Sequence, residues 1–159
     1  KTAATTTTTT TAAAFVPLWA GLCDHWNEQA KDVFVEKAVL GSPLLLQGGV
    51  ATSSIDSKQQ WDFPNAWPPL QLLLIHGLQR LSTRKADVAA ESLARSWLQS
   101  NYKAWVPNSD MYEKYNASVC GEGGGGGEYG VQVGFGWSNG VVLSLLATWP
   151  DTKLKDACK

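Results

Sequence analysis

The sequence predicts an all-α fold, and two stretches of helical periodicity carry this prediction. Residues 68–81, PPLQLLLIHGLQRL, are apolar on nearly every face, as expected of a helix that is buried on most sides. Residues 84–105 place alanine and leucine at helical spacing, with charged residues on the opposite face. No stretch shows a convincing strand-like alternation of apolar and polar residues. The predicted elements are therefore helices joined by long polar or glycine-rich loops.

The elements before these two helices are less regular. Residues 1–14, KTAATTTTTTTAAA, have low complexity and predict a tail, because they offer little apolar surface to bury. Structure is predicted to begin at FVPLW, residues 15–19, where Pro17 suits a first helical turn. Apolar residues then recur at helical spacing as far as Leu40. The glycine and proline of GSPLLLQGG, residues 41–49, predict a loop.

The C-terminal part predicts one more helix. GVVLSLLATW, residues 140–149, is apolar, and Asn139 before it is a residue type that caps helices. Pro150 predicts the end of this helix. We therefore expect one domain over residues 15–150, followed by a tail over residues 151–159.

Composition excludes several classes of function. The 159 residues carry a formal charge of -1, so no basic surface for nucleic acid is expected. No apolar run approaches the roughly 18 residues that a membrane helix needs. The three cysteines match no zinc-binding spacing, and the chain has only two histidines. Neither a metal nor a cofactor is expected.

Eight tryptophans are the unusual part of the composition. Each ring has a large apolar face with one polar handle, and in a polar or proline-rich loop such a face is suited to stack on a sugar ring. QQWDFPNAWPP, residues 59–69, holds two of them beside an aspartate, an asparagine and three prolines. This segment is compatible with a carbohydrate site, and equally with a turn that caps the following helix.

Two later segments are also candidates for chemistry. Glu113 lies in MYEKYN, residues 111–116, and on composition alone it is a solvated charge. GEGGGGGEYGVQVGFGWSNG, residues 121–140, contains five consecutive glycines followed by ring and amide groups. Such a run is either a flexible linker or a loop that closes over a ligand, since glycine accepts positive φ and lets a backbone approach closely. It does not contain the GxxxxGK[ST] pattern of a phosphate loop.

Taken together, these segments resemble the trehalases, inverting glycoside hydrolases that split α,α-trehalose into two glucoses. QQWDFPNAWPP resembles one family signature, and GGGGGEYGVQVGFGWSNGVVL resembles the glycine-rich C-terminal signature. FVPLW, GGVATS at residues 48–53 and EKY at residues 113–115 match family segments in the same order. The resemblance extends from Phe15 to about Trp149.

The resemblance implies a fold and a set of site residues. The fold is an (α/α)6 barrel whose loops at one end form a closed pocket, and this chain corresponds to its C-terminal part. The glutamate of EKY, Glu113, is implied to be the general base. The glycines are implied to be an active-site lid made of Gly123, Gly124, Gly125, Gly126 and Gly127. The implied substrate-binding residues are Trp61, Asp62, Asn65, Trp67, Glu128, Phe135 and Trp137.

One part of the catalytic machinery is not found in the sequence. An inverting glycosidase needs a second carboxyl group, about 6.5–9.5 Å from the base, that protonates the leaving oxygen. In trehalases this acid is an aspartate well before FVPLW, and no equivalent segment occurs here. Twelve helices also need on the order of 200 residues. We therefore expect trehalose as substrate and the N-terminal part of the barrel as a partner.

Two alternatives stay open at this stage. The chain is either the base-carrying part of a hydrolase or a trehalase-derived fragment that binds sugar or a partner without catalysis. Its compartment is not determined by the sequence. Asn116-Ala117-Ser118 is an N-glycosylation sequon, but about one is expected by chance in such a chain, so it is weak evidence for secretion.

Overall fold

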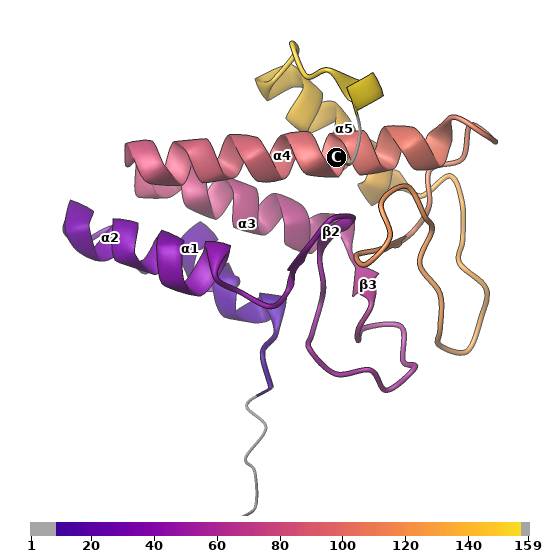
Figure 1. Ribbon diagram of the computed structural model, residues 1–159, viewed down its shortest axis with the longest axis horizontal. Helices are drawn as coiled ribbons and strands as arrows, with labels where there is room; N and C mark the ends of the chain where they lie inside the picture. Colours follow the sequence, from indigo (N-terminus) through magenta and orange to yellow (C-terminus); the bar gives the residue numbers. More distant parts are fainter. Residues whose placement is uncertain (1–8, 157–159) are drawn as a thin grey trace, which may run out of the picture.

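The computed structural model describes residues 9–156 and is mostly helical, which confirms the predicted fold class. Residues 1–8 of the expected N-terminal tail and residues 157–159 of the C-terminal tail lie outside this range. Two helices, α3 (Pro68–Leu81) and α4 (Arg84–Trp105), lie side by side at the centre (Figure 1). Both have the bounds that the sequence predicts.

Local signals explain where these two helices begin and end. Pro68 and Pro69 occupy the first turn of α3, where an N–H has no helical partner to lose. Ser82 ends the helix in the left-handed conformation, and the side chain of Thr83 caps α4 by accepting from the N–H of Ala86 at 3.2 Å. The face that α4 buries is rich in alanine, which permits a close approach to α3.

The N-terminal elements cover one side of this pair. They are the short helices η1 (Ala12–Phe15) and α1 (Val16–Trp19), then α2 (Glu28–Phe34), which continues into the π-helical turn η2 (Val35–Leu40). Helix α1 packs against α3 at Gly77, where an added Cβ would lie only 2.7 Å from the Cβ of Leu18. Arg80 of α3 also forms a bidentate ion pair with Asp24.

The C-terminal helix α5 (Gly136–Thr148) contacts both α3 and α4, and η3 (Leu154–Asp156) contacts α4. Helix α5 begins before Asn139, so the predicted cap is wrong. The Asn139 side chain instead donates within the first turn, to the carbonyl of Phe135 at 2.8 Å. Residues 151–156 also differ from a free tail, since Thr152 is buried and accepts a hydrogen bond from Arg95.

Within residues 9–156, four two-residue strands form two small antiparallel pairs in the loops. Strand β1 (Leu45–Leu46) pairs with β2 (Gly49–Val50), where the sequence predicted a loop over residues 41–49. Strand β3 (Asn65–Ala66) pairs with β4 (Tyr115–Asn116), with Asn65 opposite Asn116. This second pair brings the QQWDFPNAWPP segment against the segment that contains Glu113.

The end of the threonine run also differs from a free tail. The backbone N–H of Thr10 donates to the Ser54 hydroxyl at 3.1 Å, and that of Ala12 donates to the Thr52 carbonyl at 2.8 Å. Ala12 is buried. Among the cysteines, Cys23 has a buried, free thiol, and Cys120 is disulfide-bonded. None of the helices within residues 9–156 is long and apolar enough to span a membrane.

Candidate active site

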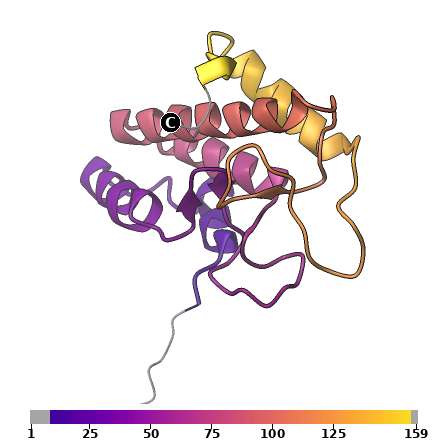
Figure 2. The same ribbon diagram turned by 45° about the vertical axis from the view of Figure 1, so that its right-hand side comes forward.

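Loops from three parts of the sequence gather at one end of the central helices, as both ribbon views show (Figures 1 and 2). The first is residues 51–67, which run from β2 to α3. The second is residues 106–120, which follow α4 and include Glu113. The third, named here the glycine-rich loop, is residues 121–135 and leads into α5. These are the loops in which the sequence places its candidate residues.

Glu113 is buried, with only 3% of its surface exposed. Its backbone N–H donates to the Gln132 carbonyl at 2.8 Å, and its carbonyl accepts from the indole N–H of Trp137 at 2.9 Å. One carboxylate oxygen, Oε1, accepts from the Tyr129 hydroxyl at 3.0 Å. The other, Oε2, is buried with no hydrogen-bond partner within residues 9–156. The carboxylate is therefore held on one oxygen, and its other oxygen is buried without a donor from the described residues.

Lys114 is fully buried beside it, which is rare for a lysine. Its Nζ donates to the Gln60 side chain at 3.3 Å and to the Gly126 carbonyl at 3.4 Å. The same ammonium lies 5.3 Å from the ring centroid of Trp67 and 5.5 Å from that of Tyr129, within cation–π range. Burial lowers the pKa of Lys114, and the neighbouring Glu113 opposes this shift. Lys114 thus connects all three loops.

The signature tryptophans form a continuous aromatic cluster. Trp61 stacks on Trp67 with ring centroids 3.8 Å apart and an interplanar angle of 3°. Trp67 meets Trp137 edge to face at 5.4 Å, and Trp137 contacts Phe135 at 4.7 Å. Trp67 is buried, whereas Trp61 is 48% exposed. Of the two signature rings, Trp61 is therefore the one with a face open to solvent.

Asn65 binds the glycine-rich loop. Its amide nitrogen donates to the Gly125 carbonyl at 2.9 Å, and its amide oxygen accepts from the Gly125 N–H at 3.0 Å. The residue is only 2% exposed, and both halves of its amide are engaged with the protein. Gly124 fits tightly here, because an added Cβ would lie 2.5 Å from Asn65 Oδ1 and 2.8 Å from Lys114 Cγ. The glycine run is thus docked over these residues.

Asp62 is engaged in the same way by its own loop. Its carboxylate accepts hydrogen bonds from Ser53, at 2.8 Å, and from Ser57. The Ser57 hydrogen bond, and then the Ser53 one, lower the pKa of Asp62. Asp62 therefore shapes the loop of residues 51–67.

The rest of the glycine-rich loop is exposed. Glu128 and Tyr129 lie on its surface, and Tyr129 is 46% exposed. Gly126 and Gly127 have positive φ angles of 73° and 84°, which favour glycine. A cavity of about 310 Å³ lies where residues 123–126 face Phe63 and Asn116. Asn116, in the sequon, donates to the Glu122 carboxylate at 3.1 Å.

The predicted site residues thus divide into two groups. Trp61, Trp67, Phe135 and Trp137 form one aromatic cluster that is linked to Glu113 through Trp137, whereas Glu128 is exposed on the glycine-rich loop. Sequence reasoning did not single out Lys114, Tyr129 or Gln60. Lys114 and Tyr129 each directly follow a predicted glutamate, and Gln60 directly precedes Trp61, so the signal available was adjacency within the same motifs.

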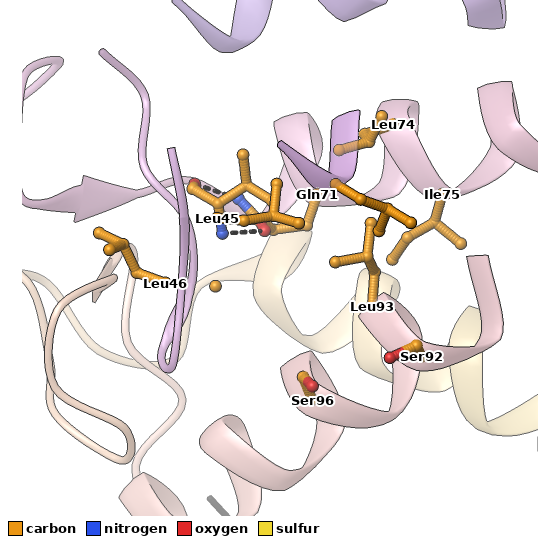
Figure 3. Close-up of a pocket in the computed structure, with 11 residues that line it drawn as sticks. Leu45, Leu46, Gln71, Leu74, Ile75, Ser92, Leu93 and Ser96 are labelled. Carbon is orange, nitrogen blue, oxygen red and sulfur yellow. Dashed lines mark hydrogen bonds between the residues drawn. The ribbon is translucent and has the colours of Figure 1, made fainter. Parts of the chain in front are cut away.

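A second cavity, of about 220 Å³, lies away from this site between the β1–β2 pair and the two central helices (Figure 3). Leu45, Leu74, Ile75 and Leu93 make it largely apolar, and Gln71 is hydrogen-bonded to the backbone of Val50 at its edge. None of the predicted site residues lines it. Residues 9–156 contain no cluster of three or more His, Cys, Asp or Glu side chains that could hold a metal ion.

Comparison with known proteins shows which family this chain resembles. The family model for trehalase matches residues 1–150. A probable trehalase of Oryza sativa subsp. japonica is 46% identical over 149 residues, which cover 89% of this chain and 26% of the relative. The trehalase of Homo sapiens is 46% identical over 135 residues, which cover 85% and 23%. The chain thus spans about a quarter of the length of these relatives.

A solved structure gives the same result for the fold. The structure of a neutral trehalase from Saccharomyces cerevisiae superposes with a TM-score of 0.69 at 28% sequence identity, over 94% of this chain and 25% of the other. This likeness confirms the expected fold, in which these helices are part of an (α/α)6 barrel. The family match also includes the threonine run, which the sequence patterns left outside the domain.

Proposed function

This chain belongs to the trehalase family, and from that premise we propose that it forms the general-base side of a site that hydrolyses α,α-trehalose to two glucose molecules. The observation that carries the proposal is the state of Glu113. Its carboxylate is buried, fixed through one oxygen and unpartnered at the other within residues 9–156. A carboxylate held in this way can position one water molecule and accept its proton.

The proposed reaction inverts the attacked anomeric carbon. Glu113 Oε2 accepts a proton from a water as that water attacks the carbon, while a carboxylic acid on the other face protonates the leaving oxygen. Burial of the carboxylate under the glycine-rich loop excludes bulk water from this step. The proton that Glu113 takes leaves to solvent once the loop opens and glucose departs.

The other predicted residues take different roles in this proposal. The exposed face of Trp61 is the surface we propose to stack on a glucose ring, with Trp67, Trp137 and Phe135 supporting it. Glu128 is exposed on the glycine-rich loop, and we propose that its carboxylate accepts hydrogen bonds from sugar hydroxyls. Asn65 and Asp62 act indirectly, because their polar atoms already hold Gly125 and two serines.

The general acid is proposed to lie in chain beyond these 159 residues, by analogy with the family's aspartate. The relatives are about four times as long as the matched region, which leaves ample room for the other half of the barrel. That half is the partner we propose, with trehalose as the substrate.

The decisive experiment measures glucose released from trehalose by the chain and by Glu113→Gln. Glu122→Gln is a matched control, since Glu122 is an exposed glutamate at the start of the neighbouring glycine-rich loop. We expect the control to behave as wild type, and Glu113→Gln to lose turnover while still binding trehalose in calorimetry. Turnover by Glu113→Gln at the wild-type rate rejects the base assignment.

A wild-type chain that is folded but releases no glucose requires a second step. The assay is then repeated with a polypeptide that restores the upstream half of the barrel. Activity in that form, abolished by Glu113→Gln, supports the proposal. Continued inactivity with retained trehalose binding favours the alternative, a sugar-binding module derived from a trehalase.

A further inference from the structure

The tip of the glycine-rich loop, residues 128–131, is attached to the base by one side chain. On one side of the tip, the Gly127 N–H donates to the Lys58 carbonyl at 3.0 Å. On the other side, the Gln132 carbonyl accepts from the Glu113 N–H at 2.8 Å. Within the described residues, the tip makes no backbone hydrogen bond to another segment. The Tyr129 hydroxyl connects the tip to its surroundings: it lies 3.0 Å from Glu113 Oε1 and also interacts with the Gln60 side chain.

The contact has a specific chemical consequence for Glu113. Gln132 and Trp137 bind only the backbone of Glu113, so they fix its Cα but not its carboxylate. The Tyr129 hydroxyl is the one donor to the carboxylate within residues 9–156. Because a hydroxyl can rotate to donate, it takes Oε1 and leaves Oε2 without a donor.

The ring that carries this hydroxyl is itself held in place. Tyr129 is 46% exposed, so packing alone does not fix its orientation. The buried Lys114 ammonium lies 5.5 Å from its ring centroid and donates to the Gly126 carbonyl at 3.4 Å. A cation against the ring face orients the ring without covering it. Lys114 therefore holds the Tyr129 ring in place while the Tyr129 hydroxyl donates to Glu113.

We propose that Tyr129 is a positioning residue for the base, so that the glycine-rich loop orients the Glu113 carboxylate only while its tip is closed. This inference rests on the proposed function and extends it, because the loop then controls the geometry of the base as well as access to the site. Opening of the tip releases Oε1 and lets the carboxylate rotate away from its working orientation.

The first test needs no turnover. The hydrogen bond to Glu113 is the main cause that raises the pKa of Tyr129. Alkaline ultraviolet titration of the wild-type chain, minus that of Tyr129→Phe, isolates the ionisation of this tyrosine. We expect its midpoint to lie above the usual tyrosine value of about 10 and to fall in Glu113→Gln. An unchanged midpoint in Glu113→Gln overturns the proposal.

The second test measures hydrolysis in the same form of the protein that releases glucose. Tyr129→Phe keeps the ring over Lys114 and removes only the hydroxyl. We expect kcat to fall about tenfold, the ordinary value of one hydrogen bond to a charged group, with KM within about twofold. Tyr102→Phe on α4 is the matched control and retains wild-type kcat. A larger change in KM than in kcat assigns Tyr129 to sugar binding and overturns the positioning role.

The two tests separate this inference from the proposed function. If the titration links Tyr129 to Glu113 but the protein never hydrolyses trehalose, the absence of hydrolysis refutes the proposed function. The catalytic role of Tyr129 is then refuted with it. A titration that shows the link, together with unchanged kcat in Tyr129→Phe, refutes the positioning role alone. A fall in kcat without the titration link also contradicts it, because the effect then does not pass through Glu113.

Discussion

The docking of the glycine-rich loop can be tested by adding one methyl group at Gly124. The methyl of alanine would lie 2.5 Å from Asn65 Oδ1 and 2.8 Å from Lys114 Cγ, both far inside van der Waals contact. Gly124 does not have a positive φ, so the effect of the substitution is steric. Asn65 can move aside only by giving up its two hydrogen bonds to Gly125.

The cost follows from these contacts. Overpacking typically costs about 1–3 kcal/mol, and each lost hydrogen bond adds about 1 kcal/mol. The structure either keeps the close contact or moves Asn65 and loses its hydrogen bonds to Gly125. In both cases we expect Gly124→Ala to reduce the free energy of unfolding by about 2–3 kcal/mol. Gly125→Ala is the matched control, since nothing lies within 4 Å of its added Cβ.

Urea unfolding of the two variants gives the comparison, and hydrogen exchange shows whether the loss is local to residues 121–135. We expect Gly125→Ala to remain within about 0.5 kcal/mol of wild type. If Gly124→Ala unfolds at the same urea concentration as Gly125→Ala, the loop is not docked on Asn65 and Lys114.

Three further predictions concern other parts of the chain. Gln71→Ala removes two 2.8 Å hydrogen bonds to the Val50 backbone, and we expect the free energy of unfolding in urea to fall by about 2–3 kcal/mol. Gln99→Ala loses one exposed hydrogen bond, and as the control it should lower this free energy by less than about 0.5 kcal/mol. Gly77→Ala should destabilise the fold by about 1–3 kcal/mol, because the added Cβ meets Leu18. Gly140→Ala has open space around its Cβ and should stabilise α5 by about 0.5–1 kcal/mol. A higher melting temperature for Gly77→Ala than for Gly140→Ala contradicts the packing at Gly77. Ser57 and Ser53 lower the pKa of the Asp62 carboxyl in the folded chain. The ionised carboxylate therefore stabilises the fold above the unfolded pKa of about 3.9, and this contribution is lost as pH falls through the lower folded pKa. Asp62→Asn should make stability depend less on pH in acid, and an unchanged pH dependence contradicts the role of the two serines.

The helices that the sequence predicted well are those marked by local signals. Helices α3 and α4 have prolines or a capping threonine at their first residues, and long periodic faces between their ends. Helix α5 begins earlier than predicted for a non-local reason. Trp137 donates to the Glu113 carbonyl and Ser138 to the Tyr112 carbonyl, which holds its first turn against a segment more than 20 residues away. No pattern within residues 136–149 contains that information.

In the candidate site, too, some features were predictable from local motifs and others depend on contacts between distant segments. Motif resemblance placed Glu113 and the tryptophans in one site, and the structure brings them together. The roles of Asn65 and Lys114 were not predictable, because an asparagine in a loop ordinarily faces solvent and a lysine is almost never buried. Their positions depend on the β3–β4 pair and on the glycine-rich loop, which bring residues about 60 apart in sequence into contact.

The glycine run is hydrogen-bonded to the loop that contains Asn65, and its glycines have different physical reasons to be there. Gly124 has no room for a side chain, whereas Gly126 and Gly127 have positive φ angles that turn the chain back over Lys58 and Gln60. The loop is bound at both ends, by Asn65 to Gly125 and by Glu113 to Gln132. A movement of the whole loop would therefore break the hydrogen bond to the segment that contains Glu113. Opening that leaves Glu113 in place is confined to residues 128–131, which include both Glu128 and Tyr129.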